Sequence, residues 1–433
     1  MSLTAQNEKL FKINYQNSRL NLKIHLKSLL KEGPYLTIIG SLIIFVGMLC
    51  SRALMSIGMI LILLDAVWTY SQNRSVSGGN HWVFLSLILI FFIYLIGGIH
   101  TEDWSFYLER LRLKLPFLLL PIAFLFIKPL QSKTYFFLLF SFLVLVSLGS
   151  VYCLSDYLLH FTERNENYLK GHVLVTPVNH IRFSLMTAYA ALIGFYLYRK
   201  WLALNLKFWA FFALFLGAFL LVFLHVLAVR SGLLAFYLAG FCMLIYDVYT
   251  QKRWLRGFSI FLLFISLPIA AYYTFPTLQQ KVSYMRYDLN NFFYQQEKRQ
   301  LSDSRRILSW QVGIQVAAEQ PLVGIGIGDV KKKVFEIYEN DYSDQPKTEW
   351  MLPHNQFIFV YAGLGLFGVV LFLVAILSPF LYKAYFLRDE LFLAFNVIVW
   401  SSFLSESTLE TQLGVCFYSI FLLLALAYLK NRK

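Results

Sequence analysis

Two arginines and a histidine stand at the boundaries of apolar stretches, where they could act on an anionic substrate. Arg230 ends one apolar stretch in HVLAVRSGLLAFYLAG, Arg306 lies in the polar segment SDSRRILSW, and His354 opens the apolar run PHNQFIFVYAGLGLFG. The planar guanidinium group of an arginine can hold two phosphate oxygens at once. A neutral histidine can take a proton from a hydroxyl group near pH 7. The residue types are suited to a transfer reaction in which a phosphate group leaves.

Each of these residues also has a purely structural interpretation. Arg230 could extend its charged head to the membrane surface, and His354 could be a polar anchor at the interface. Arg305 and Arg306 lie in the first turn of an expected helix, where a cation opposes the helix dipole unless an anion is near; the alternative is contact with solvent or lipid head groups. Pro353 at a first helical position would place His354 near the positive end of a helix dipole, which favours the neutral imidazole.

Other polar residues lie near the ends of apolar stretches. Arg182 and His180 occur together in NHIRFSL, and Glu406 and Glu410 lie in SESTLETQL. The sequence assigns no role to either glutamate, nor to the amides Asn355 and Gln356 that follow His354. No ionisable residue falls at the middle of a span, which argues against an ion-coupled transporter.

A glycine-rich turn follows the segment that carries Arg306. Gly324, Gly326 and Gly328 in GIGIGDV precede an expected helix that Asp329 could cap. Backbone amides of such a turn can bind phosphate, but the pattern matches no dinucleotide or Walker fingerprint and no strand precedes it. A structural turn between two helices is the alternative interpretation.

The composition identifies the elements that must position these residues. Of 433 residues 58% are hydrophobic and 14% are charged, whereas a soluble domain carries about 25% charged residues. The apolar runs are long and almost free of charge, so they predict membrane helices rather than the short alternating strands of a barrel. We expect an all-α polytopic membrane protein.

Hydropathy predicts about twelve transmembrane helices. The expected spans are 34–51, 53–71, 82–99, 114–128, 134–155, 181–198, 207–229, 232–250, 258–275, 354–379, 391–408 and 411–429.

The basic residues of the short loops predict the orientation. Most of them fall on one side of the membrane if both termini are cytoplasmic, as the positive-inside rule requires. The net charge of +14 then reflects topology and anionic lipid, and no nucleic-acid partner is expected. The predicted organisation is a cytoplasmic segment 1–33, nine spans in 34–275, one large outer loop in 276–353 with amphipathic helices, three spans in 354–429 and a cytoplasmic tail 430–433.

Three motifs resemble the signature regions of the O-antigen ligase and O-antigen polymerase superfamily, which includes bacterial O-linked oligosaccharyltransferases. They are RSGLLA at Arg230, SRRILSWQVGIQVAAEQPLVGIGIGDV, and PHNQFIFVYAGLGLFG. In this family an arginine ends a span, an arginine stands four residues before a tryptophan in the large periplasmic loop, and a histidine begins the next span. The matching positions here are Arg230, Arg306 and His354.

The resemblance implies a GT-C-like glycosyltransferase in the bacterial inner membrane, with a periplasmic active site. The donor would be a glycan on a polyprenyl diphosphate. Arg230 and Arg306 would stabilise the leaving diphosphate, and His354 would activate or orient the acceptor. Arg305, Arg182 and His180 are candidates for substrate binding. The outer loops contain no acidic cluster that would predict a metal site, and no cofactor is implied.

The acceptor stays open at this point. A ligase transfers the glycan to the lipid A core, a polymerase transfers it to another lipid-linked glycan, and an oligosaccharyltransferase transfers it to a protein hydroxyl. The O-antigen ligase is our preferred prediction. A more remote alternative is a flippase or exporter of lipid-linked saccharides, which would favour internal repeats and a charged central cavity.

Overall fold

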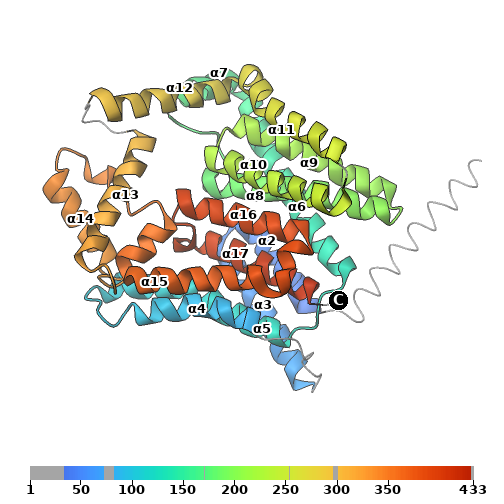
Figure 1. Cartoon of the computed structure of the whole chain (residues 1–433), viewed down its shortest axis with the longest axis horizontal. Helices are drawn as coiled ribbons and strands as arrows, with labels where there is room; N and C mark the ends of the chain where they lie inside the picture. Colours follow the sequence, from blue (N-terminus) through green and yellow to red (C-terminus); the bar gives the residue numbers. More distant parts are fainter. Residues whose placement is uncertain (1–33, 73–81, 170, 253, 296–300, 431–433) are drawn as a thin grey trace, which may run out of the picture.

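The protein is built from helices. The computed structural model describes residues 34–72, 82–169, 171–252, 254–295 and 301–430. Every regular element within these ranges is helical, and most of the long helices run along the horizontal direction of Figure 1. The predicted segment 1–33 and the end of the predicted tail, 431–433, lie outside the described residues.

Helices occupy all of the positions at which hydropathy predicts a span. In the described part of the chain, eight helices are long and apolar enough to cross a membrane, and three shorter apolar helices accompany them. The prediction of an all-α polytopic membrane protein is therefore confirmed. The helices at the predicted spans are α2 (Tyr35–Cys50), α3 (Arg52–Ser71), α4 (Trp82–Ile96), α5 (Trp104–Phe126), α6 (Ser132–Leu159), α8 (His180–Ala203), α9 (Lys207–Leu227), α10 (Arg230–Gln251), α11 (Trp254–Thr274), α15 (Gln356–Leu381), α16 (Glu390–Ser405) and α17 (Gln412–Leu429).

Helix α5 begins before the fourth predicted span, 114–128. Helix α5 already starts at Trp104, because the carboxylate of Asp103 caps it by accepting a hydrogen bond of 3.0 Å from the N–H of Phe106. The additional turns carry Arg110 and Lys114, whose charges lower the local hydropathy. A hydropathy window therefore detects only the apolar second half of this helix.

The helices differ in how much of their surface is buried. Helices α8 and α17 are buried along almost their whole length, whereas α11 is mostly exposed. In Figure 1, α17 lies in the interior of the bundle and α11 lies at its periphery. An apolar helix with little protein around it is suited to contact with lipid. The core of the bundle thus lies around α8, α16 and α17.

The long connection between α11 and α15 contains three helices, as its sequence pattern indicated. They are α12 (Pro276–Asn290), α13 (Ser302–Glu319) and α14 (Val330–Asp341). Helix α12 packs against the short α7 (Phe161–Leu169), and α13 packs against α15. The connection therefore folds onto one end of the bundle, where α8, α10 and α15 begin. We call this the site end.

The glycine turn between α13 and α14 is structural. The N–H groups of Ile325 and Gly326 each donate a hydrogen bond of 3.1 Å to carbonyl oxygens of α15. Gly324 and Gly326 have φ angles of +75° and +94°, which favour glycine. The carboxylate of Asp329 does not cap α14, since it accepts hydrogen bonds from the N–H groups that precede α5. The turn amides serve packing rather than a phosphate.

Candidate functional site

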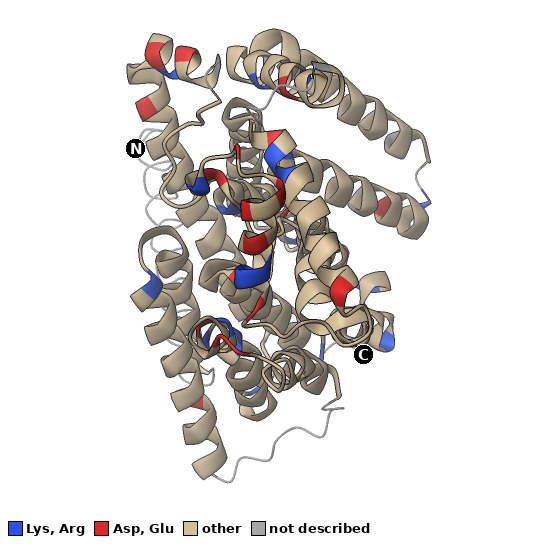
Figure 2. Ribbon diagram, turned by 90° about the vertical axis from the view of Figure 1, so that its left-hand side faces the viewer, with Lys and Arg blue, Asp and Glu red and all other residues tan. Residues whose placement is uncertain are grey.

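Charged side chains from four separate segments meet at the site end of the bundle. Figure 2 shows acidic and basic segments gathered near the middle of the view, with further charged segments scattered over other helices. At the centre is Glu406, of which 5% is exposed. Its Oε1 atom lies 2.7 Å from Nη2 of Arg306, and its Oε2 atom lies 3.3 Å from Nδ1 of His354 and 3.9 Å from Nη2 of Arg182. We call these four residues the Glu406 cluster.

The turn between α16 and α17 fixes Glu406 in this position. Its N–H donates a hydrogen bond of 2.9 Å to the carbonyl oxygen of Ser402, which ends α16. Arg182 reaches the same turn through a hydrogen bond of 3.2 Å to Oγ1 of Thr408. Burial raises the pKa of Glu406, but His354 and the charges of Arg306 and Arg182 outweigh burial and hold the pKa below its usual value. The glutamate is therefore an anion at neutral pH.

The loop helix α13 holds the backbone of His354. Its N–H donates to Oγ of Ser309 at 3.2 Å, and its carbonyl oxygen accepts from Nε1 of Trp310 at 2.9 Å. Gly313 allows close packing here, because a Cβ atom at this position would lie 2.6 Å from the ring of Pro353. The tryptophan four residues after Arg306 thus positions the histidine, and the loop covers the start of α15.

The prediction that His354 lies in the first turn of its helix is wrong. Helix α15 begins at Gln356, because the side chain of Asn355 accepts hydrogen bonds of 2.9 and 3.1 Å from the N–H groups of Phe357 and Ile358. His354 therefore precedes the cap, and the nearby carboxylate of Glu406 replaces the helix dipole as its main electrostatic neighbour. The contact at Nδ1 leaves Nε2 as the ring nitrogen that can face a substrate.

Arg230 joins the site through a second carboxylate. It begins α10 and forms an ion pair with Asp303, in the first turn of α13. The same turn is capped by Asp288 of α12, which accepts hydrogen bonds of 2.7 Å from the N–H of Asp303 and 2.6 Å from Oγ of Ser304. Because α13 also carries Arg306, the two arginines that the sequence singled out are fixed to the same helix.

Arg305 and His180 differ in their relation to the cluster. Nη1 of Arg305 lies 3.9 Å from Oε1 of Glu349, and its Nε atom donates to the carbonyl oxygen of Leu301, so its contacts stay within the loop. His180, the first residue of α8, lies within electrostatic range of Arg306 and Glu406. The contacts of Arg305 thus direct it away from the cluster, whereas His180 stands at the start of α8, two residues before Arg182.

Two charged residues at this site were not assigned by the sequence. Glu406 could be placed at the correct end of a span, but nothing in the sequence indicated that it would contact His354. Lys281 was not singled out at all, because a lysine in a polar helix of a loop looks like an ordinary surface residue. In the structure it is buried, with 8% exposed, and Arg230 and Arg306 act on its charge.

A second buried carboxylate lies in the same turn. Oε1 of Glu410 lies 2.8 Å from Nζ of Lys114, 2.5 Å from Oη of Tyr94 and 3.1 Å from Nε2 of Gln356. The other end of the Gln356 amide accepts a hydrogen bond of 2.8 Å from the N–H of Leu409. Gln356 thus has a structural role, as Asn355 has through its cap.

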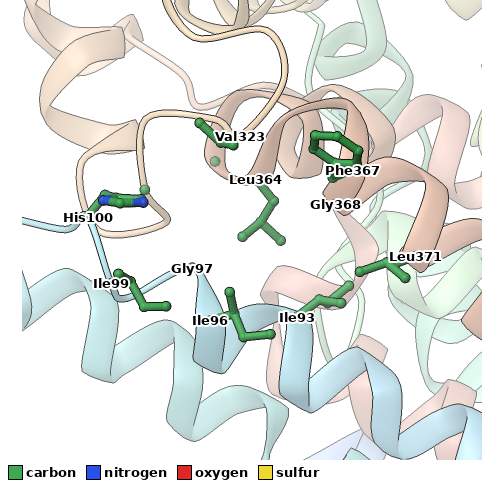
Figure 3. Close-up of a pocket in the computed structure, with 12 residues that line it drawn as sticks. Ile93, Ile96, Gly97, Ile99, His100, Val323, Leu364, Phe367, Gly368 and Leu371 are labelled. Carbon is green, nitrogen blue, oxygen red and sulfur yellow. The ribbon is translucent and has the colours of Figure 1, made fainter.

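An apolar pocket of about 160 Å³ lies apart from the charged residues. Figure 3 shows Ile93 and Ile96 at the end of α4 facing Leu364, Phe367 and Leu371 of α15 across it. Its walls are suited to a hydrocarbon group rather than a charged one.

The arrangement provides two chemical functions side by side. Arg230 and Arg306 are fixed positive charges that can stabilise an anionic leaving group without reorganisation. His354 is held by its backbone contacts, and its Nδ1 atom lies 3.3 Å from the carboxylate of Glu406, an arrangement that resembles a base with an orienting carboxylate.

Comparison with known families supports this description. A family model described as O-antigen ligase matches residues 214–373, which include Arg230, Arg306 and His354. No curated protein matches the chain. The family match confirms the resemblance to the O-antigen ligase and polymerase superfamily, and with it an association with lipid-linked glycans and the lipid bilayer. Glu406, Arg182 and His180 lie outside the matched segment.

Proposed function

Because residues 214–373 form a domain of the O-antigen ligase family, we propose that the protein transfers a glycan from a polyprenyl diphosphate to an acceptor hydroxyl. The reaction takes place at the periplasmic face of the bacterial inner membrane and needs no metal ion. The observation that supports this proposal most strongly is the contact of Glu406 with both Arg306 and His354. It joins a cation for a leaving phosphate to a base for an attacking hydroxyl.

The reaction forms one bond and breaks another at the anomeric carbon of the glycan. The acceptor oxygen attacks this carbon, while the bond from the carbon to the phosphate oxygen breaks. Nε2 of His354 takes the proton of the acceptor hydroxyl, and the polyprenyl diphosphate leaves with the bonding electron pair. Arg230 and Arg306 stabilise the negative charge that develops on it. Glu406 orients the imidazole and stabilises it once it is protonated.

The remaining candidates have supporting roles. Arg182 and His180, at the start of α8, would bind donor groups beside the cluster. Arg305 would contact the glycan from the loop, which agrees with its position near Glu349 at the side of the cluster. The positive charge that a metal ion supplies in other transferases comes here from arginines. Chelators are therefore expected to leave the transfer rate unchanged.

The acceptor is proposed to be the lipid A core, so the protein acts as an O-antigen ligase. Deletion of the gene tests this. In a strain without the gene, gels of the surface glycans should show core lipid without attached polymer, together with accumulated lipid-linked polymer. Core lipid carrying a single repeat would instead identify a polymerase. Loss of glycosylated proteins alone would identify an oligosaccharyltransferase, and unchanged glycans would contradict the proposal.

A further inference from the structure

Lys281 of α12 is a buried lysine that forms no ion pair within the described part of the chain. Only 8% of the residue is exposed. Within the described part of the chain, no carboxylate lies within ion-pair distance of its ammonium group, whose one close partner is the ring of Tyr284 at 5.3 Å. Removing an ammonium group from water costs free energy that a cation–π contact offsets only in part. A cation in this setting requires an explanation.

Helix α12 is fixed at both ends, so the position of Lys281 is determined by the fold. Near its start, Oγ1 of Thr277 donates a hydrogen bond of 2.7 Å to the carbonyl oxygen of Val226 at the end of α9. Near its end, Asp288 caps α13. Lys281 lies between these two attachments, on the helix that packs against α13.

Both cations and carboxylates act on the charge of Lys281. Arg230 of α10 and Arg306 of α13 are cations. Asp303 and Asp288 attract the ammonium group, but Asp303 is paired with Arg230 and Asp288 accepts hydrogen bonds from α13. Burial, together with the charges of the two arginines, lowers the pKa of Lys281 to about 8. The lysine therefore carries a positive charge at neutral pH that the nearby carboxylates do not neutralise.

We propose that Lys281 is a third cationic ligand of the carrier diphosphate and acts together with Arg230 and Arg306. This inference rests on the proposed function and extends it to a residue that no sequence motif indicated. A diphosphate has two phosphate groups and more than one negative charge, so three cations from α10, α12 and α13 can surround it. Binding of the diphosphate would give Lys281 a direct ionic partner, which offsets the cost of burying the lysine.

The affinity of the protein for a polyprenyl diphosphate, the leaving group, tests the role of Lys281 directly. The full chain in nanodiscs is titrated with a polyprenyl diphosphate and, separately, with the corresponding monophosphate. Lys281→Met should weaken diphosphate binding on the order of tenfold or more and reduce the preference for diphosphate over monophosphate. Lys281→Arg should retain most of the affinity. Lys332→Met is the matched control, because Lys332 of α14 is an exposed lysine of the same loop that pairs with Glu102; its affinity should equal that of the unmodified protein.

Thermal stability separates a ligand-binding lysine from a structural one. Because an unpaired buried cation destabilises the ligand-free protein, Lys281→Met should melt at the same temperature or higher while binding diphosphate more weakly. A lower melting temperature together with weaker binding would show a structural lysine and overturn the inference. Unchanged diphosphate affinity in Lys281→Met would overturn it as well. If the unmodified protein does not distinguish a polyprenyl diphosphate from the monophosphate, the proposed function itself fails.

Discussion

Glu406 and Glu410 lie in the same turn between α16 and α17, yet their surroundings differ. Two partners of Glu406 are open to a substrate, since 25% of the His354 side chain and 24% of the Arg306 side chain are exposed, whereas Arg182 is buried. Glu410 contacts Lys114, Tyr94 and Gln356, all of which are fully buried. One carboxylate therefore belongs to an accessible site, and the other belongs to a closed network.

The difference shows how a membrane protein can place a reactive cluster beside a rigid one. The Glu410 network joins α4, α5 and α15 to the turn, and Arg110 adds a hydrogen bond of 3.0 Å to the carbonyl oxygen of Glu410. Burial raises the pKa of Glu410, but the charges of Lys114 and Arg110 and the hydrogen bonds outweigh it and keep the pKa below its usual value. We infer that the Glu410 network fixes the turn, so that Glu406 keeps its geometry toward His354.

The largest expected effect on catalysis is at His354, the partner of Glu406. His354→Ala should lower the rate of glycan transfer by about 10² to 10⁴-fold, because the acceptor loses its base. Protein level and melting temperature should not change. His160→Ala, in an exposed histidine at the end of α6, is the control and should transfer at the normal rate. Transfer at an undiminished rate by His354→Ala would remove the histidine from the mechanism.

A large effect on stability is expected at Glu410, the carboxylate of the buried network. Glu410→Ala leaves Lys114 buried without its partner, which should destabilise the protein by about 3–5 kcal/mol. Thermal unfolding of the purified protein measures this loss. The double variant Glu410→Met with Lys114→Met should recover much of the stability, because it removes both buried charges. Normal stability of Glu410→Ala would show that the Glu410 network does not stabilise the turn between α16 and α17.

A smaller effect is expected when the charge of Glu406 is removed but its shape is kept. Glu406→Gln should lower kcat by roughly 10- to 100-fold, since the imidazole loses its orienting anion. KM should stay close to normal, and the melting temperature should fall less than in Glu410→Ala, because Arg182 keeps its hydrogen bond to Thr408. Glu406→Asp should recover part of the activity. If Glu406→Gln instead loses stability as Glu410→Ala does, the distinction between the two carboxylates is wrong.

The site was predictable in part, because its motifs are local. The arginine at the start of α10, the arginine four residues before a tryptophan and the histidine after a proline can all be recognised in short stretches. Their placement at the same end of the bundle followed from the order of the spans. The contact of His354 with Glu406 could not be predicted, because the two residues are separated by the whole of α15 and α16 and only packing brings them together.

The sequence by itself determined the fold class and the positions of most helices, because long apolar stretches have no other stable structure in a bilayer. The tertiary structure decided which charges are partners. It showed that α5 begins at Trp104 and buries Lys114 against Glu410, and that Asn355 excludes His354 from its helix. It also buried Lys281 on α12, the helix that packs against α13. The physical reason is that a buried charge becomes tolerable only through groups from other segments, which hydropathy and spacing do not report.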